Sequence, residues 1–187
     1  MYKQIINYKI DIERLKTETV LLFENKDLFS DTFKTQLGLT YANGKSKNKY
    51  LDAVGSLDWD YENWDGEGNP PPRKDKVKEK DFVKIVPDLK GTYLYDLIKD
   101  LQNKFHIGRT RLLLMEPKTC LTWHQDSTYR LHIPIITNDR CMMVWHNKTV
   151  HMPQGTLYWV DTTQPHTAFN GSFEKRIHLV TTVENKQ

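Results

Sequence analysis

Apolar residues recur at helical spacing in two segments of the first part of the chain. Steps of three and four residues bring side chains to one face of a helix, so each segment predicts an amphipathic helix. The first helix is expected over residues 12–24, with Asp11 as its N-cap. The second is expected over Leu89–Phe105, and Gly108 should end it. The stretch before the first helix, Gln4–Ile10, is a candidate short strand.

From Arg109 onward the pattern becomes a series of short apolar runs with turn residues between them. Runs of this length, bounded by proline, glycine and asparagine, are typical of strands. Many short strands that follow helices predict a mainly β protein, a jelly roll with an N-terminal helical cover. The expected strands are Arg109–Met115, Leu131–Ile136, Cys141–Trp145, Thr156–Val160 and Lys175–Val183.

The length of 187 residues fits a single domain over residues 1–187. Residues 1–107 would form the helical cover, with an insertion at 41–80, and residues 108–187 would carry the motifs of the jelly-roll core. The mixed-charge run Arg73–Lys80 inside that insertion is expected to be a solvated loop or helix face.

Charge and cysteine content narrow the functional classes. A net charge of +3 does not by itself indicate a nucleic acid or a membrane surface as partner. Cys120 and Cys141 lack CxxC spacing and imply no disulfide framework. No apolar run is long enough for a signal peptide or a membrane span. We therefore expect a cytoplasmic protein.

The candidate chemistry starts at the run Thr122-Trp123-His124-Gln125-Asp126. On an extended strand, residues two apart point to the same face, so His124 and Asp126 would present an imidazole and a carboxylate together. Two histidines and one carboxylate are the usual ligand set of non-haem Fe(II) oxygenases. A lone pair of this kind is also compatible with a simple hydrogen bond between the two side chains. Trp123 is expected in the core or the pocket wall.

A third ligand must come from a later strand, and His166 in the run from Gln164 to Asn170 is the candidate. Arg176 follows ten residues later, so that it can point into the same barrel from the next strand. Its planar guanidinium suits a carboxylate in bidentate fashion, which makes Arg176 a candidate anchor for a carboxylate ligand. Periodicity alone leaves open whether Arg176 faces the inside or the surface.

These motifs together resemble the aspartyl/asparaginyl β-hydroxylase family of Fe(II)- and 2-oxoglutarate-dependent dioxygenases. The resemblance runs from Arg109 to Val183 and depends on three features: the HxD pair, a later Pro-His with an arginine ten residues on, and Arg-Leu-His-Ile-Pro behind the HxD. The matching residues are Arg111-Leu112, Pro117, His124-Gln125-Asp126, Arg130 to Pro134, Gly155, Asp161, Pro165 to Asn170 and Arg176 to Val180.

The resemblance implies a double-stranded β-helix, which is a jelly roll of the cupin kind. It implies that His124 and His166 bind Fe(II), that Arg176 pairs with the distal carboxylate of 2-oxoglutarate, and that Arg130 and His132 contact the cosubstrate near the metal. Dioxygen would be the second cosubstrate. The animal protein-hydroxylating members lack an acidic ligand after the first histidine, so Asp126 makes this site similar to the ordinary facial triad.

The prime substrate implied by the resemblance is an amino-acid side chain, free or in a peptide. The insertion is expected either to cover the mouth of the barrel as a lid or to pack on its outer surface. As a lid, Trp59 and Trp64 would offer apolar area to the substrate, and the acidic residues Asp58, Asp60, Glu62 and Asp65 would favour a cationic or amide-bearing partner. Asn170 is a turn residue or a further site contact.

Two other classes of function fit the same strands. A cupin-like module could bind a metal without oxidising anything, and a structural jelly roll could carry these histidines incidentally. Turnover of 2-oxoglutarate to succinate with Fe(II) distinguishes the enzyme from both.

Overall fold

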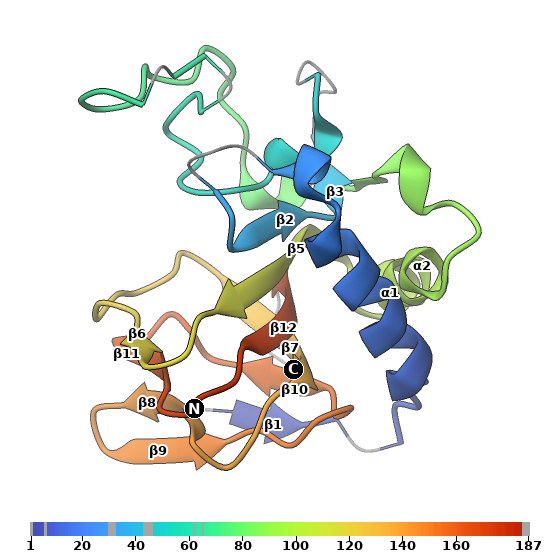
Figure 1. Ribbon diagram of the computed structural model, residues 1–187, viewed down its shortest axis with the longest axis vertical. Coiled ribbons are helices and arrows are strands. Elements are labelled where there is room, and N and C mark those ends of the chain that lie inside the picture. Colours follow the sequence, from blue (N-terminus) through green and yellow to red (C-terminus); the bar gives the residue numbers. More distant parts are fainter. Residues whose placement is uncertain are drawn as a thin grey trace.

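The computed structural model describes residues 2–5, 7–29, 33–42, 47–61, 63–64 and 66–184. Two antiparallel sheets face each other in the lower part of Figure 1, with an apolar cluster between them. The larger sheet has the strand order β1 (Tyr2–Gln4), β10 (Tyr158–Val160), β7 (Tyr129–Ile136), β12 (Arg176–Val183), β5 (Ile107–Met115) and β2 (Gln36–Gly38). The smaller sheet has the order β6 (Thr119–Cys120), β11 (His166–Asn170), β8 (Cys141–Trp145) and β9 (Lys148–His151). The predicted jelly roll is confirmed.

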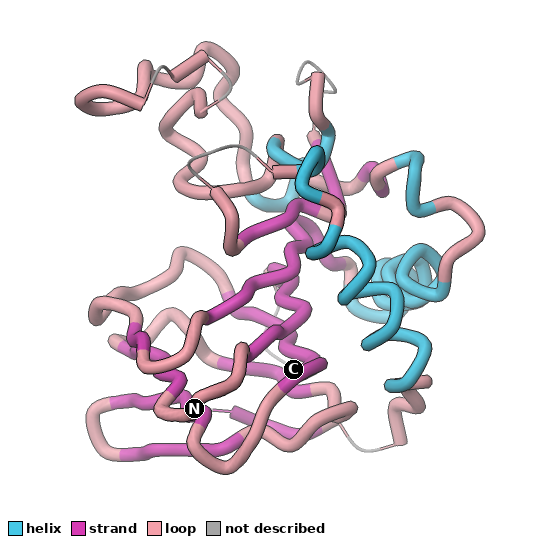
Figure 2. Tube along the Cα trace, viewed as in Figure 1, coloured by secondary structure: helices cyan, strands magenta, loops and turns pink. Residues whose placement is uncertain are grey.

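Two helices, α1 (Ile12–Glu24) and α2 (Tyr93–Phe105), cover the outer face of the six-stranded sheet, and Figure 2 shows both on one side of the strands. The central strands β7 and β12 are therefore covered on both faces and are buried over nearly their whole length. Each fully buried leucine or isoleucine here stabilises the fold by about 1.5–3 kcal/mol. Helices and sheet share a core that includes Leu15, Leu94, Ile98, Leu112, Leu131, Ile133 and Leu179.

The first helix spans the predicted residues because Asp11 caps it, accepting the backbone N–H of Arg14 at 3.2 Å. The second ends at Phe105, as predicted, but begins at Tyr93 and not at Leu89. His106 closes it in the left-handed conformation, with φ 50°, so the prediction that Gly108 ends the helix is wrong. Gly108 lies inside β5, where a side chain would collide with the backbone carbonyl of Glu79.

The predicted strand at residues 4–10 is also mostly wrong. Among the described residues before α1, only Tyr2–Gln4 pair as a strand, antiparallel to β10. Tyr8 instead reaches the second helix, where its hydroxyl donates to Asp100 at 2.6 Å. The chain leaves the sheet at this point because it must cross to the helical cover.

The insertion lies near the N-terminal end of β5, in the upper part of Figure 1. The short pair β3 (Thr40–Tyr41) and β4 (Lys84–Ile85) flanks it. Two 3₁₀ turns lie near its ends, η2 (Lys49–Leu51) and η3 (Glu79–Asp81). Outside the insertion, η1 (Lys26–Leu28) follows α1 and η4 (Pro87–Leu89) precedes α2. A buried arginine fixes the insertion to the barrel, since Arg109 of β5 donates to the carbonyl of Ala53 at 2.8 Å and to that of Gly55. Within the described ranges, neither helix is long and apolar enough to cross a membrane.

Candidate metal centre

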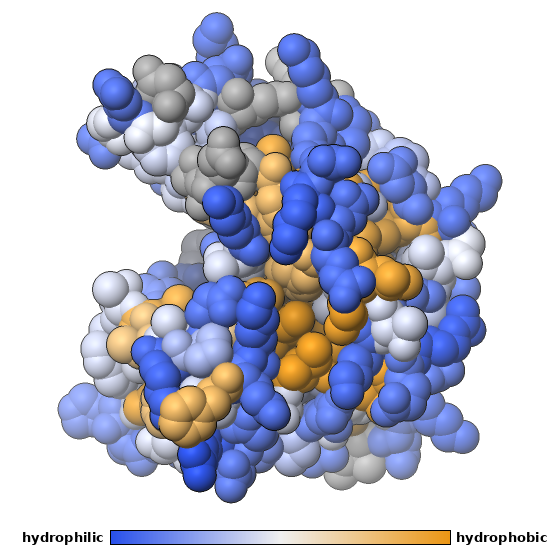
Figure 3. Space-filling model, in the orientation of Figure 1, coloured by the Kyte–Doolittle hydropathy of each residue, from blue (hydrophilic) through white to orange (hydrophobic). Residues whose placement is uncertain are grey.

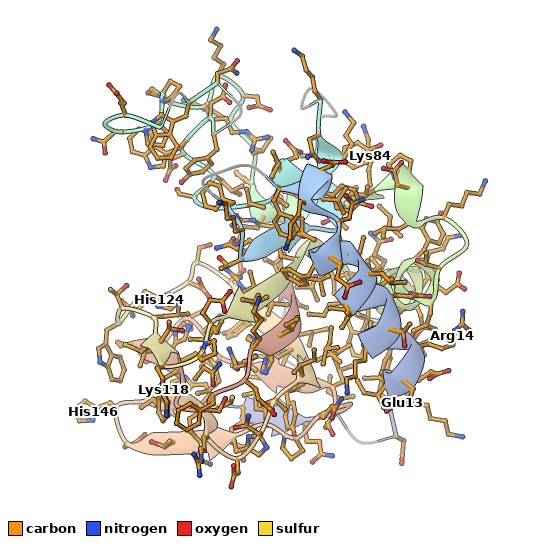
Figure 4. All side chains as sticks on the ribbon, viewed as in Figure 1. Glu13, Arg14, Lys84, Lys118, His124 and His146 are labelled. Atoms are coloured by element: carbon orange, nitrogen blue, oxygen red, sulfur yellow. The ribbon has the colours of Figure 1, made fainter. Side chains whose placement is uncertain are left out.

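The three residues predicted as metal ligands converge between the two sheets. One ligand atom each from His124, Asp126 and His166 lies within 4.8 Å of the others. His166 begins β11 and is buried, whereas the other two are half-buried in the segment after β6, where Figure 4 labels His124. A backbone hydrogen bond of 2.8 Å from Asp126 N–H to the carbonyl of Thr162 fixes the carboxylate end of this segment.

A local irregularity aims His124 inward. The N–H of Leu121 donates to the carbonyl of Ala168 at 2.9 Å, and His124 exchanges two backbone hydrogen bonds with His166, at 3.0 and 2.9 Å. Three residue steps on one chain thus face two on the other, which is the geometry of a β-bulge. The extra residue turns Trp123 outward with 56% of its surface exposed, so the prediction of a core or pocket-wall position is wrong.

Backbone carbonyls select the tautomer of both histidines. His124 Nδ1 lies 2.8 Å from the carbonyl of Thr122, and His166 Nδ1 lies 2.9 Å from that of Gln164. A carbonyl can only accept, so each Nδ1 carries hydrogen and each Nε2 keeps its lone pair for a metal. Burial also lowers the pKa of His166, which favours the neutral form that metal binding requires.

Arg130 connects the metal cluster to the insertion. Its guanidinium lies 3.2 Å from Asp126 Oδ1 and 3.0 Å from Glu79 Oε1, and Arg109 lies 3.4 Å from the same oxygen of Glu79. The hydroxyl of Thr128 donates to the other oxygen at 2.8 Å. Burial would raise the pKa of Glu79, but Arg130, Thr128 and Arg109 hold it below its ordinary value. Glu79 is therefore an ionised counter-charge for two arginines.

Glu79 was missed by the sequence analysis because it lies in the run Arg73–Lys80, which was expected to be solvated. Its side chain is only 12% exposed, so that expectation is wrong at this position. The one feature of the sequence that relates to this contact is Gly108. Its lack of a side chain lets the Glu79 backbone pack against β5.

Arg176 lies inside the barrel, which settles the alternative that the sequence left open. It is 5% exposed, and its guanidinium contacts Met115 Sδ at 3.0 Å and His178 Nδ1 at 3.2 Å. Its Nε has no hydrogen-bond partner, and no carboxylate among the described residues pairs with it. Burial lowers its pKa to about 10, so it remains a cation near neutral pH. A buried cation without a counter-charge is unfavourable and indicates an anionic ligand.

Arg111 is a second arginine that lacks a carboxylate partner among the described residues. Its guanidinium contacts Gln36 Oε1 at 3.2 Å, its buried Nε has no partner, and it pairs with no carboxylate in the described ranges. Burial and the nearby Arg109 and Arg130 lower its pKa well below the ordinary value. The three candidate ligands and both arginines line one cavity of about 90 Å³, together with Leu113, Leu121, Arg130, His132, Met143, Thr162, Ala168, His178 and Val180.

The remaining predicted site residues, His132, Trp59 and Trp64, do not all lie in the cavity of the metal cluster. His132 lines the cavity, so the structure brings it together with the metal cluster. Trp59 lines a separate cavity inside the insertion, and the indole of Trp64 donates to the carbonyl of Glu67 at 3.0 Å. Neither lines the cavity of the metal cluster, and their predicted contact with substrate stays a prediction. Glu62 and Asp65 lie outside the described residues.

Asn170 has a structural role in the turn between β11 and β12. Its amide donates to the carbonyls of Met115 and Glu174, at 3.1 and 2.7 Å. Its oxygen accepts from the hydroxyl of Ser172 at 2.7 Å and from the thiol of Cys141. These bonds use the donor and acceptor capacity of the side chain, which favours the turn over the alternative of a site contact.

Three kinds of comparison relate this chain to known proteins. Residues 79–186 match the family model described as Aspartyl/Asparaginyl beta-hydroxylase, a match that includes Glu79 and the whole metal cluster. A curated relative, L-proline cis-4-hydroxylase from Rhizobium meliloti (strain 1021), is 29% identical over 94 residues, which are 47% of this chain and 34% of the relative. The chain therefore spans about a third of the length of that relative.

Two solved structures show partial similarity. One is an oxidoreductase of the 2OG-Fe(II) oxygenase family from Burkholderia pseudomallei, with 13% identity, a TM-score of 0.40, and coverage of 48% of this chain and 57% of that one. The other is a cupin domain from Bordetella pertussis Tohama I, with 15% identity, a TM-score of 0.37, and coverage of 41% and 81%.

Proposed function

Because the chain belongs to the aspartyl/asparaginyl β-hydroxylase family, we propose that it is an Fe(II)- and 2-oxoglutarate-dependent dioxygenase that hydroxylates an unactivated C–H bond of an amino acid. One observation carries the proposal. The cluster of His124, Asp126 and His166 shares a cavity with Arg176, a buried cation without a carboxylate partner among the described residues. A metal site beside an anion site is what a 2-oxo acid cosubstrate requires.

The donor set fits Fe(II). Two neutral imidazoles with free Nε2 atoms and one carboxylate form the two-histidine-one-carboxylate set, which leaves positions open for other ligands. When bound, Fe(II) and 2-oxoglutarate supply the oxidation with dioxygen, yielding succinate, carbon dioxide and a hydroxylated product. The protein holds the ligands in place and excludes water around them.

Arg176 would bind the distal carboxylate of 2-oxoglutarate. The guanidinium offers its free Nε, and a carboxylate there would neutralise a charge that the fold leaves uncompensated. Arg130 would act nearer the metal, where it already pairs with Asp126, and His132 lines the same cavity. These assignments agree with the roles that the family resemblance implies.

The charge of the cavity favours a prime substrate that carries a carboxylate. Arg109 and Arg130 share Glu79, and Asp126 belongs to the metal cluster, which leaves Arg111 free once Arg176 holds the cosubstrate. We assign the substrate carboxylate to Arg111. A small free amino acid supplies such a group, and the relative named L-proline cis-4-hydroxylase takes one by its name.

The acids of the insertion do not support the earlier expectation of a cationic substrate. The carboxylate of Asp58 accepts from Ser56 at 3.0 Å, and that of Asp60 accepts from the amide of Asn63 at 2.7 Å. Both carboxylates are thus engaged within the insertion, whereas the arginines without carboxylate partners line the cavity of the metal cluster.

The test is Fe(II)-dependent release of succinate in the presence of a panel of free amino acids and short peptides. We expect one or a few free amino acids to stimulate succinate release and to gain one oxygen atom by mass spectrometry. Omission of iron and the variant His166→Ala are the controls and should abolish both signals. Metal binding without succinate release under any condition would favour the cupin-like module that does not oxidise.

A further inference from the structure

We propose that His178 is a second donor, beside Arg176, for the distal carboxylate of the cosubstrate, and that it acts through its Nε2–H. The inference rests on the proposed function, because it concerns how the same cavity holds a 2-oxo acid. It adds a residue whose position on β12 the sequence analysis did not connect with a ligand.

The strand places His178 beside Arg176. Residues two apart on β12 share a face, and both side chains are buried, at 2% and 5% exposure, and line the metal cavity. The pairing of β12 with β7 shifts register between Ile177 and His178, where Pro134 stands opposite. Proline cannot donate to the ladder, so a central strand accommodates it at such an irregularity. Irregularities of this kind re-aim side chains next to active sites.

Arg176 fixes the tautomer of His178. Its Nη2 lies 3.2 Å from His178 Nδ1. A guanidinium can only donate, so Nδ1 holds a lone pair and accepts, and the single ring hydrogen of the neutral imidazole is on Nε2. Burial and the adjacent Arg176 lower the pKa of His178 well below its ordinary value, which keeps the ring neutral. His178 therefore presents one fixed N–H donor.

That donor has no acceptor. His178 Nε2 is buried and makes no hydrogen bond with any residue the structure describes, and the same holds for Arg176 Nε. Buried donors are almost always paired, so each orphan requires an explanation. The two orphans lie on residues two apart on one strand and in one cavity, and one of them belongs to an uncompensated cation, so together they match the two oxygens of a carboxylate. The metal cluster is formed by other residues, so His178 is not needed as a ligand there.

Two substitutions separate the ring atoms. Asparagine places an amide near the position of Nδ1 and can still accept from Arg176, but it does not reach the position of Nε2. Glutamine can place an amide N–H near Nε2. His178→Asn should therefore remove the proposed donor, and His178→Gln should retain it.

Binding is measured without turnover. The protein is loaded with Mn(II) in the absence of dioxygen and titrated calorimetrically with 2-oxoglutarate and with 2-oxopentanoate, which lacks the distal carboxylate. A lost hydrogen bond to a charged group corresponds to roughly tenfold or more in affinity. We expect His178→Asn to weaken 2-oxoglutarate by about that factor, to leave 2-oxopentanoate and Mn(II) unchanged, and His178→Gln to restore most of the loss.

A measurement on the unsubstituted protein covers the case in which a variant fails to fold. With ¹⁵N-labelled histidine and Zn(II) as the metal, NMR should show the Nε2–H tautomer of His178 and a downfield shift of this proton with 2-oxoglutarate but not with 2-oxopentanoate.

The outcomes are distinguishable. If His178→Asn binds 2-oxoglutarate as the wild type does, or weakens both 2-oxo acids equally, the proposal is wrong and His178 is structural. If the NMR signal responds equally to both 2-oxo acids, the proposal is also wrong. If the wild type binds neither 2-oxo acid, the proposed function itself fails, and this inference fails with it.

Discussion

The guanidinium of Arg130 lies 3.2 Å from Asp126 Oδ1, while the other oxygen, Oδ2, lies 3.9 Å from His166 Nε2. The carboxylate is thus held at one oxygen by a cation that is itself fixed by Glu79, and the second oxygen faces the histidines. A ligand oriented in this way needs little rearrangement to coordinate a metal, because an outer residue already sets its position.

The first prediction concerns the metal. His124→Ala and His166→Ala should each lower the affinity for a divalent ion by at least 10- to 100-fold, since two remaining ligands hold a labile ion poorly. Asp126→Ala should be milder because both imidazoles remain. The measurement is titration with Co(II), followed by its visible spectrum. His146→Ala removes an exposed histidine on the turn between β8 and β9 and serves as the control. Unchanged affinity in both histidine variants would exclude the cluster as the metal site.

The second prediction concerns Arg176. Arg176→Lys keeps the charge but loses the planar fork, so it should weaken 2-oxoglutarate by roughly tenfold and leave metal affinity unchanged. Titration of the metal-loaded protein with 2-oxoglutarate measures the effect. Arg140→Lys, at an exposed arginine before β8, is the matched control. Wild-type affinity in Arg176→Ala would place the cosubstrate elsewhere.

Much of this site could be predicted from the spacing of its residues, even though His124 and Asp126 lie in the irregular segment after β6 and not on the expected strand. His124, Asp126 and His166 have recognisable spacing, and the structure brings them together. The inward position of Arg176 could not be derived, because both faces of β12 are buried and alternation gives no contrast between them. The position of Arg111 could not be derived for the same reason, because β5 is also buried on both faces over most of its length.

The role of Glu79 was not predicted, for a different reason. Its role depends on a long-range approach between the insertion and β5, and local composition does not encode that approach. The residue that terminates the second helix was not predicted, because His106 adopts a left-handed conformation that local sequence favours for glycine. At Glu79, tertiary packing overrode a local preference.

The third prediction concerns stability through Glu79. Glu79→Gln removes the carboxylate that two buried arginines share, which leaves Arg130 with Asp126 alone and Arg109 with no carboxylate partner among the described residues, and it should destabilise the fold by about 3 kcal/mol at pH 7. The pKa of Glu79 is lowered below its ordinary value of 4.5, so its contribution is complete above that pH and is lost as the pH falls further. Urea unfolding at pH 7 and at pH values below 4.5 should show the difference between variant and wild type shrinking on acidification.

Glu184→Gln is the control for this prediction. Glu184 pairs with Lys80 at 3.9 Å, and both side chains are exposed, so its loss should change stability by no more than about 0.5 kcal/mol. A Glu79→Gln variant as stable as this control would show that the arginines do not depend on Glu79.

The fourth prediction concerns His178 and pH. Its folded pKa lies well below the ordinary 6.5, so the unfolded chain binds a proton that the folded protein excludes. Stability should therefore fall as the pH drops below 6.5, by up to about 1.4 kcal/mol per pH unit for each such histidine. In the metal-free protein, His178→Gln should show a smaller fall than wild type by about that amount. His146→Gln should retain the wild-type pH dependence, and equal slopes in all three proteins would contradict a neutral His178.

The last prediction concerns the insertion. Figure 3 shows a notch between the upper lobe, which contains the insertion, and the barrel, and His124 lies on the barrel side of it in Figure 4. The base of the insertion is fixed at the site by Glu79, and its loop is braced by Tyr61, whose ring packs against Phe33 with centroids 4.5 Å apart. A loop that is anchored so close to the metal cluster can close over a bound substrate and exclude water.

Replacement of residues 57–66 by a Gly/Ser linker tests this lid. As a lid, its loss should reduce turnover of the prime substrate by 100-fold or more, which is roughly the cost of misplacing a substrate. Metal affinity and slow succinate release without substrate should persist, because the cavity residues are untouched. Trp64→Phe, which removes the hydrogen bond to Glu67 and part of the ring that packs against Tyr61, is a milder variant. Native substrate turnover in a folded linker variant would show that the insertion packs on the barrel surface and takes no part in selecting the substrate.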